Sequence, residues 1–234
     1  MRTRAPVSDA ATPIAGSLVV LAALAWAWTA ARADMPTCHG MALLPFLVMW
    51  TVMMAAMMLP SVIPVVFAFI ALVRPRGRTV LPATLAFVAG YLVVWGLLGL
   101  PARGLVDGAA RLVARVPALA HGAGVVLVAC GLYQLTPLKD ACLVHCRVPQ
   151  LFLGHHWRDG LDGAFLLGAH HGLYCAGCCA SLMVVLLVVG MMNLAWMVGL
   201  SALIALEKFL PAGRLIGRLA GGALVAVGVA RMVA

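Results

Sequence analysis

Charged residues are scarce in this chain. Asp, Glu, Lys and Arg together make up 10% of its 234 positions, only seven residues are acidic, and 65% are hydrophobic. A soluble domain is nearer a quarter charged and half apolar. This shortage excludes an ordinary soluble domain and predicts a protein of the lipid bilayer, which we expect in a bacterial inner membrane.

Acidic residues are so few that the formal net charge is +9. The basic residues form short clusters between apolar runs and no groove-sized patch, so the charge does not indicate nucleic-acid binding. Clusters of this kind are typical of the cytoplasmic loops of membrane proteins. The chain also has no nucleotide-binding motif, so any transport would be passive, ion-coupled or dependent on a partner.

Long apolar runs account for most of the chain. About 20 apolar residues cross a bilayer as a helix, and on that rule we predict an all-α, polytopic transmembrane bundle of about seven spans. No linker or repeat divides it, so we expect one integral membrane domain over residues 1–234. The distribution of Lys and Arg predicts that the N-terminus lies inside and the C-terminus outside. The predicted spans are residues 14–30, 43–73, 82–100, 118–136, 163–189, 193–206 and 215–233.

The fifth predicted span contains two imidazoles and three thiols: His170, His171, Cys175, Cys178 and Cys179. At about 100° per residue, His171, Cys175 and Cys178 share one helical face, with Cys179 at its edge and His170 about a quarter turn away. Titratable groups within a membrane usually face the bundle interior. Thiolates and imidazoles bind soft and borderline metals, so we predict a metal site here. The alternative is that the cysteines only pack.

Cys142 and Cys146 lie four residues apart in the longest polar connection, residues 137–162. On a helix this spacing places both thiols on one face. They are either a metal or redox pair or two half-buried cysteines that pack. We expect Lys139 and Arg147, close by, to lower the pKa of both thiols.

Four further residues extend this set of soft ligands. Cys38 and His39 stand between two methionines and are a candidate capture site on the outer side, while Met53 and Met57 form a stripe along the second span. Thioethers bind Cu(I) and few other biological ions. A methionine stripe is also common packing, so both interpretations stay open.

Glu207 and Lys208 end the sixth predicted span. One interpretation is an interfacial ion pair with a lysine that extends its ammonium to the membrane surface. The other turns Glu207 inward as a metal ligand or a proton acceptor.

Several short stretches, spread over residues 45–230, resemble the DUF2182 family of predicted metal-binding integral membrane proteins. They are Ala56–Ser61, Tyr133–Lys139, Cys142–Leu143, Cys146–Pro149, Gly172, Cys175–Cys179, Leu182–Met183, Gly190–Met197 and Glu207–Lys208. Ala180 departs from the family pattern, which often has Trp after the paired cysteines, but every candidate ligand is in place. The resemblance implies metal binding and names no reaction.

We therefore expect a protein that handles a soft transition metal, copper as Cu(I) first and zinc second, by transport or delivery in the membrane. A metallochaperone or a membrane protein would be its partner. Two alternatives stay open: a membrane redox metalloenzyme with an open coordination position, or an assembly subunit in which zinc staples the helices. The sequence does not decide whether the protein is an enzyme.

Overall fold

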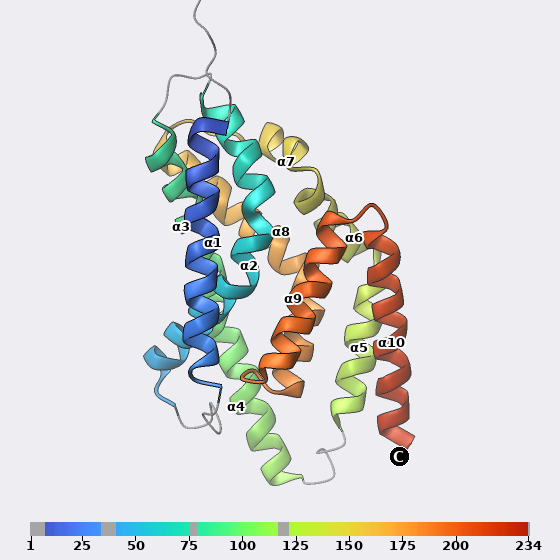
Figure 1. Ribbon diagram of the computed structural model, residues 1–234. Helices are drawn as coiled ribbons and strands as arrows, with labels where there is room; N and C mark the ends of the chain where they lie inside the picture. Colours follow the sequence, from blue (N-terminus) through green and yellow to red (C-terminus); the bar gives the residue numbers. More distant parts are fainter. Residues whose placement is uncertain (1–7, 34–40, 75–78, 117–121, 234) are drawn as a thin grey trace, which may run out of the picture.

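The computed structural model describes residues 8–33, 41–74, 79–116 and 122–233, and within these ranges it contains ten α-helices and no strand (Figure 1). Helices satisfy all their backbone polar groups internally, which an apolar environment requires. The helices are α1 (Ser8–Ala30), α2 (Leu43–Val73), α3 (Val80–Leu97), α4 (Gly99–Arg115), α5 (Ala123–Gln134), α6 (Pro137–Arg147), α7 (Pro149–His156), α8 (Gly160–Val189), α9 (Leu194–Phe209) and α10 (Gly213–Val233).

Local sequence signals account for several helix ends. The Thr136 hydroxyl accepts a hydrogen bond from the backbone N–H of Lys139, and Pro137 occupies the first position of α6. The Asn193 side chain caps α9 in the same manner. Side chains of these types satisfy backbone groups that a helix start leaves unpaired. After α8 the backbone turns at Gly190, whose φ of +106° suits a residue without Cβ.

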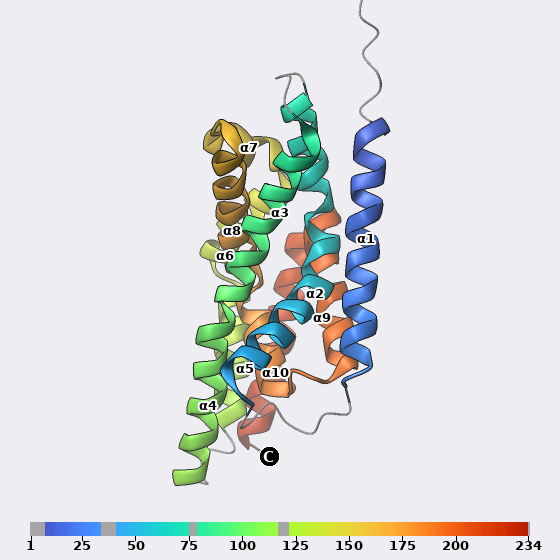
Figure 2. The same ribbon diagram turned by 90° about the vertical axis from the view of Figure 1, so that its left-hand side faces the viewer.

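The long helices run side by side along one axis of the bundle (Figures 1 and 2). Helix α1 packs against α2 at one edge, α3 packs against α8, and α5 pairs with α10. Helix α8 also contacts α5, α6 and α9, and α2 contacts α9. The short helix α7 lies toward the end of the bundle where α2 ends, and α6 lies beside the adjoining ends of α9 and α10 (Figure 1). This arrangement surrounds the middle of α8 with other helices.

The prediction of about seven spans is wrong. Within the described residues, five helical segments are long and apolar enough to cross a membrane: Thr12–Ala30, Leu43–Val73, Val80–Arg115, Gly160–Val189 and Gly213–Val233. The predicted spans 118–136 and 193–206 contain α5 and α9, which have 12 and 16 residues and fall short of the usual crossing length. The five long segments are consistent with a membrane protein. The orientation, with the N-terminus inside and the C-terminus outside, stays a prediction.

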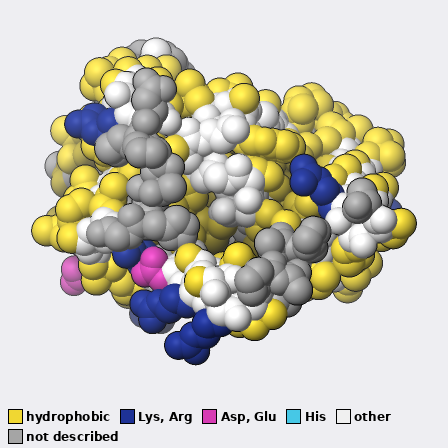
Figure 3. Space-filling view, turned by 90° about the horizontal axis from the view of Figure 1, so that it is seen from below, with side chains coloured by type: hydrophobic (Ala, Val, Ile, Leu, Met, Phe, Trp, Pro, Cys, Tyr) yellow, Lys and Arg dark blue, Asp and Glu magenta, His cyan; other side chains and the backbone are white. Residues whose placement is uncertain are grey.

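Figure 3 views the end of the bundle toward which α4 and the C-terminus point. Basic side chains stand singly or in small groups among hydrophobic ones, and acidic side chains are few. Helix α4 contributes an ion pair within one helical face, between Arg103 Nε and Asp107 Oδ2.

Close backbone contact fixes α3 against α8. A Cβ on Gly90 would overlap the carbonyl oxygen of Phe165, and a Cβ on Gly168 would overlap that of Phe87. Small residues let helices approach in this way where a membrane supplies little hydrophobic driving force. The contact between α3 and α8 therefore fixes the position of α8, which carries Cys175, Cys178 and Cys179.

We predict that Gly168→Ala destabilises the protein, because the added methyl group meets backbone that cannot move aside. The expected cost is about 1–3 kcal/mol, typical of overpacking, and it is measured as a lower thermal unfolding midpoint in detergent. Gly16→Ala is the matched control, since a Cβ there has nothing within 4 Å. Equal midpoints for the two variants would contradict the close α3–α8 contact.

Candidate metal centre

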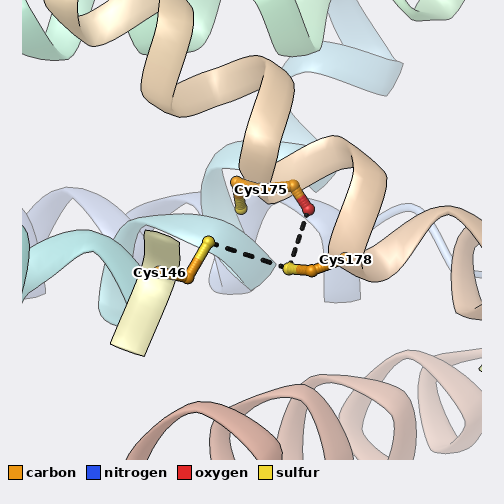
Figure 4. Close-up of side chains that lie close together, drawn as sticks. All are labelled: Cys146, Cys175 and Cys178. Carbon is orange, nitrogen blue, oxygen red and sulfur yellow. Dashed lines mark hydrogen bonds between the residues drawn. The ribbon is translucent and has the colours of Figure 1, made fainter. Parts of the chain in front are cut away.

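Three thiols meet where α6 crosses α8. The sulfur atoms of Cys146, Cys175 and Cys178 all lie within 4.8 Å of one another, and all three residues are buried. The Sγ atoms of Cys146 and Cys178 are 3.8 Å apart. Figure 4 shows Cys146 reaching from α6 toward the two cysteines of α8. We refer to these three residues as the thiol cluster.

Helical spacing and one glycine bring the thiol cluster together. Cys175 and Cys178 are three residues apart on α8 and so lie on the same face. Helix α6 comes close because Gly177 has no side chain: a Cβ there would lie 2.7 Å from Cys142 Sγ. The Tyr133 hydroxyl donates a 2.7 Å hydrogen bond to the Gly177 carbonyl and ties α5 to the same turn.

A buried lysine stands beside the thiol cluster. Lys208 Nζ of α9 donates hydrogen bonds to Cys175 Sγ at 3.1 Å and to Ser61 Oγ at 3.0 Å. Tyr91 Oη also lies 3.1 Å from Cys175 Sγ. A buried ammonium needs compensating partners, and the Cys175 sulfur and the Ser61 hydroxyl accept its hydrogen bonds. The interpretation in which Lys208 extends to the membrane surface is therefore wrong, because Lys208 is only 6% exposed.

Cys179 and His171, both predicted ligands, lie next to the thiol cluster. Cys179 Sγ is 3.4 Å from Cys178 Sγ. His171 is buried one helical turn before Cys175, and its ring stacks on Phe87. Among the described residues, nothing forms a hydrogen bond with His171 Nδ1. Buried polar atoms usually have partners, so the unpartnered nitrogen of His171, one turn from Cys175, is consistent with a ligand role.

Cys142 and His170 lie apart from the thiol cluster. Both are half-buried and line a pocket of about 320 Å³ together with His156, Leu173 and Tyr174. Burial raises the pKa of the Cys142 thiol. The expected lowering by neighbouring cations is therefore wrong at this position. Cys142 and Cys146 share one face of α6, but Cys142 lines the pocket whereas Cys146 belongs to the thiol cluster.

The two cations expected to activate Cys142 bind Glu207 and its neighbours instead. Lys139 Nζ pairs with Glu207 Oε2 at 2.7 Å in a buried ion pair. Arg147 donates to the backbone carbonyls of Glu207 and Leu210 at the end of α9. Glu207 thus turns inward, as one interpretation expected, and its carboxylate meets Lys139. The ion pair holds α6 against α9.

The remaining predicted ligands divide into two groups. Met53 and Met57 of α2 are buried in the hydrophobic core of the bundle, where they pack. Cys38 and His39 lie outside the described residues.

Three side chains near Cys175 were not predicted to lie there: Tyr91 and Lys208 contact its sulfur, and Ser61 contacts Lys208. A polar residue within an apolar run was the only signal that each gave. Lys208 adjoins Glu207 at the end of a short apolar helix, which also fits a surface position. The contact between Lys208 and Cys175 spans 33 residues of sequence, so periodicity within one helix does not find it.

Residues 47–231 match a protein family described as PpoB2, copper chaperone. The chain belongs to this family. No curated protein and no solved structure matched. The matched region includes the whole thiol cluster, Lys208 and the pocket residues. It supports the copper part of the metal prediction, whereas the DUF2182 name stays a prediction.

We predict that Cys142 reacts with a maleimide faster than the three thiols of the cluster, because Cys142 is half-buried and they are buried. The native protein is labelled briefly in detergent under reducing conditions, unfolded, and mapped by peptide mass spectrometry. Cys130, a buried thiol on α5, is the internal control for slow labelling. Equal labelling of Cys142 and Cys178 would contradict the enclosed cluster.

Proposed function

We propose that this chain binds Cu(I) at Cys146, Cys175 and Cys178 within the membrane and delivers it to a partner. One observation carries the proposal: three buried thiols with sulfur atoms within 4.8 Å of one another, in a chain of a copper chaperone family. Thiolates select Cu(I) among the common biological ions. Burial keeps water away from the ion and protects its oxidation state.

The charge beside the cluster suits a Cu(I) complex. A Cu(I) ion bound by two thiolates and one neutral thiol would carry one net negative charge, which the Lys208 ammonium, 3.1 Å from Cys175 Sγ, would balance. Zinc in structural sites takes four ligands, and the cluster supplies three sulfurs. Copper is therefore preferred to zinc as the cargo. His171 and Cys179 lie nearby, but neither belongs to the group of ligand atoms within 4.8 Å of one another.

Delivery requires the ion to leave as well as bind. A soft ion moves between thiols by ligand exchange, in which an incoming sulfur loses its proton and the departing sulfur regains one. We propose that Cys38 and His39 capture the ion on the outer side and that Met53 and Met57 lie along its path. The recipient would be a metallochaperone or a membrane protein at the bacterial inner membrane.

We predict that Cys146→Ser/Cys178→Ser lowers the affinity for Cu(I) by more than about 10-fold, since even loss of an outer-shell partner commonly costs that much. The measurement is competition with a coloured Cu(I) chelator, under anaerobic reducing conditions, on the full chain in detergent. Cys130→Ser is the matched control, because Cys130 is buried on α5 outside the thiol cluster.

Unchanged affinity in the double variant would refute copper binding by the thiol cluster. An equal loss in Cys130→Ser would show that the effect follows from general loss of packing. The thermal unfolding midpoint of each variant is measured beside its affinity.

A further inference from the structure

A pocket opens on the surface at the junction of α6, α7 and α8. Its volume is about 320 Å³, and its lining includes one thiol and two imidazoles, Cys142, His156 and His170. The three come from three different helices, which lie close together in Figure 1. All three residues are half-buried, so each is partly accessible. Thiol and imidazole groups are ligands for copper.

The thiol cluster, by contrast, has little access to solvent. Cys175 is 0% exposed and Cys178 is 1% exposed. An ion cannot reach such sulfurs directly, so it needs a first ligand nearer the surface. Cys142 fits this role by position, because it lies one helical turn before Cys146 on α6.

The contact at Gly177 joins the pocket to the thiol cluster. Cys142 Sγ lies against the α8 backbone there, since a Cβ on Gly177 would be 2.7 Å from it. The next residue of α8 is Cys178. The thiol of the pocket therefore stands beside the turn of α8 that carries a thiol of the cluster.

Two imidazoles, those of His156 and His170, also line the pocket. The ring centroids of His156 and His170 are 5.6 Å apart. His156 Nδ1 lies 3.1 Å from the Phe152 carbonyl oxygen. When Nδ1 donates to that carbonyl, Nε2 remains as the nitrogen that can bind a metal. A hydrogen bond of this kind fixes both the ring and its tautomer.

The pocket is less compact than the thiol cluster. Among the described residues, the thiol cluster is the one group of three or more His, Cys, Asp and Glu ligand atoms lying within 4.8 Å of one another. The pocket ligands are more widely spaced, so they would hold an ion weakly until it moves on. Weak binding at an accessible site lets an ion pass on to another ligand.

We propose that Cys142, His156 and His170 form a surface exchange site through which Cu(I) enters or leaves the thiol cluster. This inference rests on the proposed copper binding at Cys146, Cys175 and Cys178. The ion stays Cu(I) throughout, so no oxidant or reductant takes part. Each incoming thiol gives up its proton as it binds, and each departing sulfur takes one back.

The test compares the rate of copper release with the amount of copper bound. The full chain in detergent is loaded with one Cu(I) and mixed with bathocuproine disulfonate, and the coloured complex is followed by stopped flow. The pocket variant is Cys142→Ser/His156→Asn. The matched control is Cys130→Ser/His155→Asn, which also removes one thiol and one imidazole. His155 lies on α7, as His156 does, but neither Cys130 nor His155 lines the pocket.

We expect the pocket variant to bind the same amount of copper as the control at equilibrium. We expect it to release that copper about tenfold more slowly. A tenfold change corresponds to about 1.4 kcal/mol in the barrier. The single variant His156→Asn, at a half-buried surface position, is run in parallel in case the double variant does not fold, and it should slow release in the same direction.

Release at the control rate or faster would overturn the exchange site. Loss of bound copper at equilibrium in the pocket variant would overturn it too, because the pocket residues would then be ligands of the buried ion. Failure of the proposed function is a separate result: Cys146→Ser/Cys178→Ser would retain copper with unchanged affinity.

Discussion

The structure depends on one buried positive charge, the ammonium of Lys208, which is shielded from solvent. The Lys208 ammonium is buried among helices and makes hydrogen bonds to Ser61 and Cys175. Isolation of such a charge in an apolar interior is costly, so it needs an anion and well-placed acceptors. Lys208 therefore ties α2, α8 and α9 together at the level of the thiols. It also provides the charge that a Cu(I)–thiolate complex needs beside it.

A second buried charge pair holds the helix that completes the site. Lys139 and Glu207 pair at 2.7 Å, and this contact fixes α6 beside α9. Cys146 then projects from α6 toward α8. Glu207 and Lys208 are adjacent in sequence, so the end of α9 anchors α6 through one side chain and the thiols through the next. The two buried charges place elements from distant parts of the chain around one group of sulfurs.

Helical periodicity was enough to predict part of the site. It placed Cys175 and Cys178 on one face of an apolar helix, and the structure has their sulfurs together. Periodicity did not separate Cys142 from Cys146, because their different environments depend on how α6 crosses α8. It also missed Lys208, whose contact with Ser61 spans 147 residues. Apolar run length overcounted the spans, because it does not show where a helix begins and ends.

X-ray absorption spectroscopy of the copper-loaded protein tests the central claim most directly, because it reports the atoms bound to the metal without a mutation. The protein is loaded with one equivalent of Cu(I) under reducing conditions. The account predicts a Cu(I) edge and a first shell dominated by sulfur, as expected for the thiols of Cys146, Cys175 and Cys178. A shell of nitrogen and oxygen atoms without sulfur would contradict it.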